Sequence, residues 1–131
     1  MIADEFFATN YRVLEEILCR AYKRCAEGKG KERHAVNDQL FEEQQIVSIP
    51  RILAGGSVEF EQDVHTASAA VLFQAVKKIY ESQRLPNQQA TAELLDAIIY
   101  IAAAVELHDE LAVAEQRRMD KENRINAPIP K

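Results

Sequence analysis

The chain has 131 residues, of which 47% are hydrophobic and 28% are charged, and its formal net charge is −5. This length fits one globular domain, and an acidic chain lacks the basic surface that general nucleic-acid binding requires. The longest weakly charged run, residues 97–105, is too short to cross a bilayer, and residues 1–25 lack the apolar core of a signal peptide. We expect one helical domain at 1–122, a flexible tail at 123–131, and no contact with membranes.

The first predicted helix covers residues 4–27. Gly28 is expected to end it, because glycine adopts the left-handed backbone of a helix C-terminus without steric cost. Cys19 and Cys25 lie on different faces, so we expect reduced thiols and a cytoplasmic protein. Lys23 and Arg24 would lower the pKa of a reactive Cys25, but a core thiol is favoured. The helical apolar stripe has spacings of four and three and consists of Phe7, Tyr11, Leu14, Leu18, Ala21 and Cys25.

Residues 31–56 show no long helical period. Residues 38–47 are compatible with a short helix. Because proline is tolerated only at a helix start, Pro50 should limit residues 49–53 to one further turn. We therefore expect a short irregular or helical segment between the long helices.

Two further helices are predicted on either side of Pro86. The second covers residues 57–85 and has Ser57 as its N-cap, and the third begins after Asn87 as N-cap and continues to about Met119. The third helix is apolar around nearly its whole circumference, which is typical of a helix buried on several sides. Its apolar residues are Leu94, Leu95, Ile98, Ile99, Ile101, Ala102 and Val105.

The predicted fold is all-α, with three long helices plus the short irregular segment. The second and third helices should form an antiparallel hairpin, since only a short connection joins them. Three helices with such wide apolar faces rarely cover one another. We therefore expect an antiparallel bundle that is completed by oligomerisation, most simply as a homo-oligomer.

The motif Glu93-Leu94-Leu95-Asp96 places two carboxylates three positions apart, on one face of the third helix. Such a pair can bind Mg²⁺ and leave coordination positions for water and phosphate oxygens. Tyr100 follows one turn later on the same side. Alternatively, Glu93 lies near the helix start because of the helix dipole, and Asp96 is a solvated or hydrogen-bonded polar residue.

The stretch ELLDAIIYIAAA resembles the third helix of the MazG-like all-α nucleoside triphosphate pyrophosphohydrolases, and the resemblance covers residues 70–105. It implies a helical oligomer that binds Mg²⁺ through an ExxE pair and an ExxD pair and cleaves between the α- and β-phosphates. Glu81, Glu93 and Asp96 match these metal ligands. Lys78 stands where the fourth acid is expected. Either Lys78 contacts phosphate directly, or the chain has the fold without the chemistry.

A cationic segment follows the first helix, at Lys29, Lys31, Arg33 and His34. Together with its glycines it is suited to phosphate binding, although lysines are also favoured beside a helix C-terminus. On the second helix, Gln74 could contact a nucleotide base while Lys78 contacts a phosphate. The cationic segment and the FEEQ that follows it also resemble small phage and prophage proteins.

Three functions remain open. The first, which the sequence favours, is binding or sequestration of a nucleotide or other phosphorylated small molecule by a helical homo-oligomer. The second is a divergent Mg²⁺-dependent nucleotide pyrophosphohydrolase. The third is a helical interaction or inhibitor protein without a small ligand. The scattered histidines, His34, His65 and His108, show no zinc-site spacing, and His65 is expected at a helix surface or interface.

Overall fold

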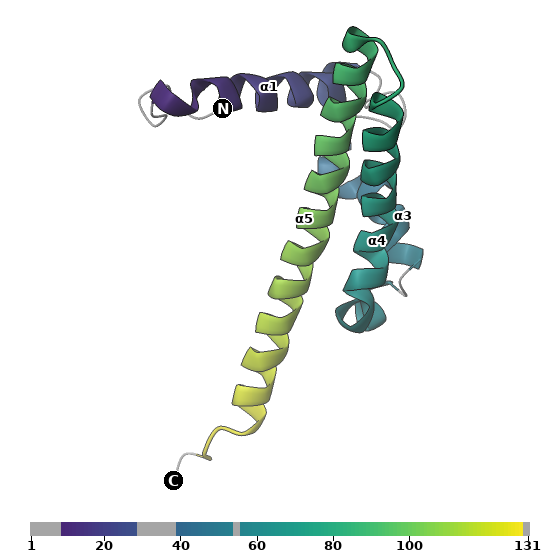
Figure 1. Ribbon diagram of the computed structural model, residues 1–131. Coiled ribbons are helices and arrows are strands. Elements are labelled where there is room, and N and C mark those ends of the chain that lie inside the picture. The colour runs from purple at the N-terminus through teal and green to yellow at the C-terminus, as the bar shows by residue number, and fades with distance from the viewer. Residues whose placement is uncertain (1–8, 29–38, 54–55, 130–131) are drawn as a thin grey trace.

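The computed structural model describes residues 9–28, 39–53 and 56–129, and side chains at 9, 53 and 56–64 are not described. All regular structure in these ranges is helical (Figure 1), which confirms the all-α prediction. The short middle segment contains a fourth α-helix that the sequence pattern did not fully predict. The elements are η2 (Thr9–Tyr11), α1 (Arg12–Glu27), η3 (Phe41–Glu43), α3 (Gln45–Leu53), α4 (Gly56–Ser82) and α5 (Asn87–Ile125).

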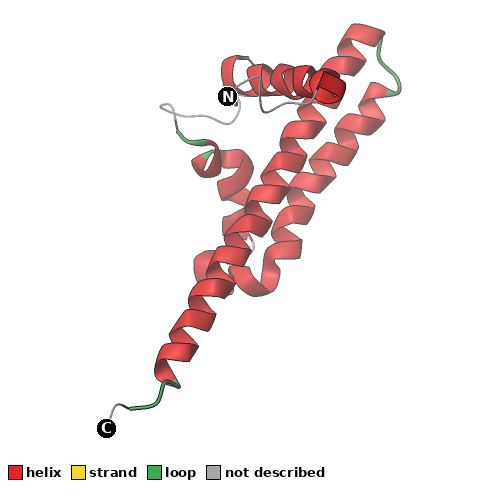
Figure 2. Cartoon of the chain, turned by 90° about the vertical axis from the view of Figure 1, so that its left-hand side faces the viewer, coloured by secondary structure: helices red, strands yellow, loops and turns green. Residues whose placement is uncertain are grey.

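Helices α4 and α5 form the predicted antiparallel hairpin (Figures 1 and 2). The predicted helix ends need small corrections. Helix α4 already includes Ser57. Pro86 occupies the N-cap of α5 and its carbonyl accepts a 2.8 Å hydrogen bond from the Ala90 N–H, so Asn87 is the first helical residue. Helix α5 also runs past Met119 to Ile125, which places the start of the predicted tail within a helix.

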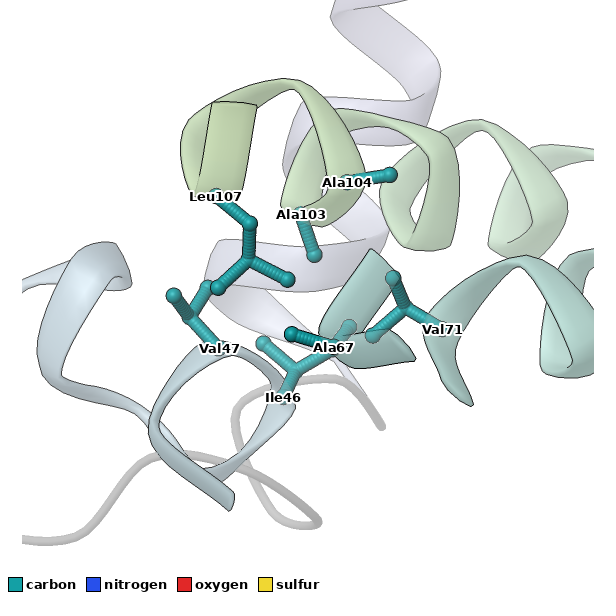
Figure 3. Packing of buried hydrophobic residues seen from close by; sticks show 7 residues of the cluster. All are labelled: Ile46, Val47, Ala67, Val71, Ala103, Ala104 and Leu107. Carbon is teal, nitrogen blue, oxygen red and sulfur yellow. The ribbon is translucent and has the colours of Figure 1, made fainter. Parts of the chain in front are cut away.

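The core lies where α3 packs across the α4–α5 hairpin (Figure 3). Val47 and Leu107 are its largest fully buried side chains. Most other members are small, which lets the backbones of α4 and α5 approach closely. The buried cluster consists of Ile46, Val47, Ala67, Val71, Ala103, Ala104 and Leu107.

Helix α3 continues through Pro50, so the expectation of only one further turn at residues 49–53 is wrong. A proline inside a helix removes one backbone hydrogen bond and strains the preceding turn. Burial offsets that cost, because Pro50 is itself buried and follows the core residues Ile46 and Val47. Arg51, the next residue, forms an ion pair with Glu110 of α5 at 2.8 Å, which fixes the end of α3.

Helix α1 runs across α5, and its tertiary packing is chiefly on that helix (Figure 1). Ala21 is buried there, but much of the predicted apolar stripe is not covered. Tyr11, Leu14 and Leu18 are 58%, 52% and 48% exposed. The third predicted helix shows the same discrepancy, because α5 is not buried on all sides within one chain.

Gly28 ends α1 as predicted, but for a different reason. Its backbone has φ −119° and ψ −142°, which is not the left-handed conformation that we expected. A Cβ atom at this position would lie 2.9 Å from the Arg24 carbonyl oxygen, closer than real Cβ atoms come. Glycine is therefore required here by the close approach of the preceding helical turn.

The core makes a prediction about stability. Leu107→Ala should lower the free energy of unfolding by about 3 kcal/mol, because it leaves a cavity among α3, α4 and α5. Met119→Ala is the control, since Met119 is 51% exposed on the same helix, and it should change stability by less than about 0.5 kcal/mol. Urea titrations of both variants measure the difference. Equal losses would contradict the assignment of Leu107 to the core.

Candidate functional site

Four charged side chains meet where α1, α4 and α5 come together. Arg24 of α1 donates from Nη2 to Asp96 Oδ2 at 3.2 Å, and its Nε donates to Asp96 Oδ1, so the contact is bidentate. Lys78 of α4 lies 3.0 Å from Glu93 Oε2 and 4.0 Å from Asp96 Oδ2. Both acids of the ExxD motif thus point to one place, together with two cations from other helices.

This charge cluster, defined as Arg24, Lys78, Glu93 and Asp96, is partly withdrawn from water. The relative exposure of the side chain is 27% for Arg24 and 16% for Asp96. It is 13% for Lys78 and 19% for Glu93. The hydrogen bond from Arg24 to Asp96 raises the pKa of the guanidinium, and the charges of Asp96 and Glu93 add to this against the opposing effect of burial. Glu93 Oε2 is buried and accepts no hydrogen bond, so Lys78 compensates it by charge alone.

The cluster has two positive and two negative charges, so its acids already have counter-ions. A divalent cation bound by Glu93 and Asp96 would have to displace both Arg24 and Lys78. Within the described ranges, no group of three or more histidine, cysteine or acidic residues is arranged to hold a metal. Binding of Mg²⁺ by the ExxD motif stays a prediction.

The other residues that the sequence singled out are dispersed. Glu81 forms an i,i+4 ion pair with Lys77 at 3.9 Å and keeps 32% of its side-chain exposure. Gln74 is half-buried on α4, and Tyr100 packs against the hydrophobic core. The structure therefore brings Lys78 together with Glu93 and Asp96. The cationic segment at Lys29, Lys31, Arg33 and His34 lies outside the described residues.

Sequence reasoning missed the role of Arg24, which it treated only as a neighbour of Cys25. The available signal was its place on α1, three positions after the buried Ala21, where a long cation can reach the packed side of the helix. Cys25 is half-buried, and burial together with the charge of Asp96 raises its pKa. This direction is opposite to the one that a reactive thiol beside Lys23 and Arg24 would have, and Cys25 is not among the core residues.

A second charged region lies in the groove between α3 and α5. Arg51 pairs with Glu110 and also donates to the Glu42 carbonyl oxygen at 3.1 Å. Glu106 faces this groove together with Asp109. Burial raises the pKa of Glu106, and the charges of Glu110, Glu42 and Asp109 raise it further, against the opposing charge of Arg51. The region is an acidic surface with one cation holding α3 in place.

The hairpin also has a largely apolar outer face, on the side of α4 and α5 away from the charge cluster. His65 of α4 and His108 of α5 mark one end of it, with ring centroids 5.3 Å apart. Six of its large members, Leu72, Val76, Ile79, Leu94, Ile101 and Val105, are 40–54% exposed, so the single chain leaves them in contact with water. The outer face consists of His65, Ala69, Leu72, Val76 and Ile79 of α4 and Leu94, Ile98, Ile101, Val105, His108 and Ala112 of α5.

In comparisons with known proteins, no family model matches the chain, and no curated protein or solved structure matches it significantly. The resemblance of residues 70–105 to the MazG-like enzymes therefore stays a prediction. Among the helices in the described ranges, none is long and apolar enough to cross a membrane.

The charge cluster makes a prediction that separates Lys78 from its neighbour. Lys78→Met keeps the length of the side chain but leaves Glu93 without a counter-ion. It should lower the free energy of unfolding by about 2 kcal/mol, because partly exposed pairs lose less than fully buried ones. Lys77→Met is the matched control, since that ion pair is more exposed, and it should cost no more than about 0.5 kcal/mol. Chemical denaturation measures both; a neutral Lys78→Met would show that the cluster contributes nothing.

The raised pKa of Glu106 makes a prediction about pH. Its folded-state pKa lies above the ordinary value of 4.5, so the folded chain holds this proton more tightly and loses stability as pH rises through that window. Glu106→Gln should therefore raise the melting temperature at pH 7, and its advantage should shrink as pH falls and Glu106 becomes neutral. Glu115→Gln, an exposed acid on the same helix, is the control. Melts between pH 4 and pH 8 test this, and an advantage that grows toward acid pH would contradict it.

Proposed function

We propose that the chain is a helical protein–protein interaction protein that acts through exposed apolar helix faces and not through catalysis. The observation that carries this proposal is the outer face of the hairpin. Leu72, Val76 and Ile79 of α4 are 40%, 49% and 42% exposed, and Leu94, Ile101 and Val105 of α5 are 44%, 45% and 54% exposed. Contiguous apolar surface of this kind on a folded chain marks a contact with another macromolecule.

The uncovered face of α1 supports the same proposal. Tyr11, Leu14 and Leu18 form one apolar line along the helix, and Val13 and Ile17 widen it. An amphipathic helix that leaves this line in water fits recognition of another helix or an apolar groove. The chain thus has two apolar faces, on different helices, that its own core does not use.

The charge cluster gives less support to the two nucleotide hypotheses. A phosphate-binding site needs cations that are available to the ligand, but Arg24 and Lys78 neutralise Asp96 and Glu93. A pyrophosphohydrolase needs acids that are available to Mg²⁺, and these two acids are engaged with the same cations. The described residues therefore favour a structural role for the cluster, which connects α1 and α4 to α5.

Thermal melts with a panel of nucleoside mono-, di- and triphosphates, each with and without Mg²⁺, test this proposal. We expect no shift with any of them. A ligand at about one hundred times its Kd would stabilise the fold by roughly 2.7 kcal/mol, which such melts resolve easily. The undescribed cationic segment is present in the full chain, so the experiment includes it.

Two outcomes would overturn the proposal. Stabilisation by a nucleotide without turnover would indicate the binding protein that the sequence favoured. Release of pyrophosphate from a triphosphate in the presence of Mg²⁺ would indicate the enzyme. Lys78→Glu then serves as a diagnostic variant, because it adds an acid beside Glu93 and Asp96 and should strengthen any response to Mg²⁺ while weakening a contact between Lys78 and phosphate.

A further inference from the structure

We infer that the outer face of the hairpin binds the same face of a second copy of this chain, so that two hairpins form a four-helix assembly. The inference rests on the proposed function and names the partner of one of its two apolar faces. It is carried by the register of the hairpin, by the spacing of its apolar residues, and by the surface area of the single chain.

The register places the outer residues of α4 and α5 side by side. The ring contact between His65 and His108 fixes one end, and the ion pair between Lys78 and Glu93 fixes the other. In an antiparallel pair, residue numbers fall on one helix as they rise on the other. Leu72 is therefore level with Ile101, and Ile79 is level with Leu94. The apolar residues form one two-helix surface and not two separate lines.

The spacing on both helices is that of helices packed in bundles. The outer positions recur at intervals of four and three, at 65, 69, 72, 76 and 79 on α4 and at 94, 98, 101, 105, 108 and 112 on α5. An interval averaging 3.5 residues keeps a stripe facing a neighbouring helix along its length. Neither series contains an aspartate, glutamate, lysine or arginine. A helical partner with the same spacing is the occupant that this surface fits.

Residue size separates this face from the inner contact of the hairpin. Between α4 and α5 the fully buried residues are mostly small, including Ala67, Ser68, Ala75, Ala97 and Ala104. Apart from Val71 and Leu107 of the core, many of the larger Leu, Ile and Val side chains of the hairpin lie on the outer face. A chain that folded to act alone would gain more from burying the larger side chains, because hydrophobic stabilisation follows the apolar area removed from water.

The total surface supports a second copy as the partner. The chain exposes 9811 Å², whereas a folded monomer of 14.8 kDa exposes about 7,000 Å². The surplus is about 2,800 Å², and a standard interface covers roughly 800 Å² on each partner. The total also includes the residues outside the described ranges, and the projecting charged end of α5 accounts for a further part of the surplus. A largely apolar face with the same spacing on both helices can pack against its own copy, as two-fold symmetric dimers require.

Native mass and concentration-dependent melting test the inference. Light scattering after size exclusion should give twice the chain mass of 14.8 kDa, and the melting temperature should rise with protein concentration. Val105→Lys should weaken the dimer at least about 100-fold, because it places a charge in the interface from each copy. Val76→Lys tests the same face from α4.

Val113→Lys is the matched control. Val113 has the same side chain on the same helix and is 51% exposed, against 54% for Val105. It faces the groove with Arg51, Glu106 and Glu110, where a lysine is tolerated beside the acids, and it should leave the dimer intact. If both face variants lose their fold while Val113→Lys keeps it, the inference is supported, because obligate dimers lack a stable monomer.

The inference is overturned by a wild-type chain that stays monomeric at about 100 μM, far above the Kd of a stable dimer. It is also overturned if Val105→Lys and Val76→Lys retain the wild-type mass, which would place self-association elsewhere, for example on α1. Neither result concerns nucleotides. A monomer whose melts are unaffected by nucleotides would refute the second copy and leave the proposed function standing.

Discussion

The close approach of α4 and α5 is the constraint on which the rest of the structure depends. Small residues such as Ala67, Ala75 and Ala104 fill the contact between the two helices, so their backbones pack closely and side chains between them cover little area. Each helix then keeps its larger apolar residues on other sides. One of these sides receives α3, which adds Ile46 and Val47 to the core. Among the described residues, no other helix covers the outer face.

The position of α1 depends on electrostatics more than on apolar burial. Ala21 is its one fully buried residue, and the bidentate contact from Arg24 to Asp96 is what fixes its orientation on α5. Lys78 joins α4 to the same two acids. Partly buried ion pairs add little net stability, because desolvation offsets much of the attraction. An arrangement that leaves one of these charges buried without its partner is strongly destabilised. The cluster therefore specifies how three helices meet.

The sequence predicted what local periodicity determines. The helical stripes, the turn at Pro86 and the position of the end of α1 at Gly28 follow from spacing and residue type, and they gave the all-α class and the hairpin, although the physical reason for Gly28 is its close approach to Arg24. The pairing of Arg24 with Asp96 could not be predicted, because it joins residues 72 positions apart and depends on where α1 crosses α5. Lys78 was interpreted as a replacement for a metal-binding acid, because its ion pair with Glu93 also depends on how two helices pack. Glu93 itself had been identified from the sequence. The prediction for Pro50 was wrong because the sequence shows the lost backbone hydrogen bond, which is a local effect. It does not show the burial of Pro50, which depends on helices distant in the sequence.

The charge cluster and the outer face lie on opposite sides of the hairpin. An α-helix turns about 100° per residue, so residues two apart point in nearly opposite directions. Lys78 and Val76 differ by two positions on α4, and Asp96 and Ile98 differ by two positions on α5. Helix α1 therefore docks on one side and leaves the other open along its length. Docking of α1 and pairing of two hairpins do not compete for surface, so one chain can hold its own fold together by charge and still present an uninterrupted apolar face to a second copy.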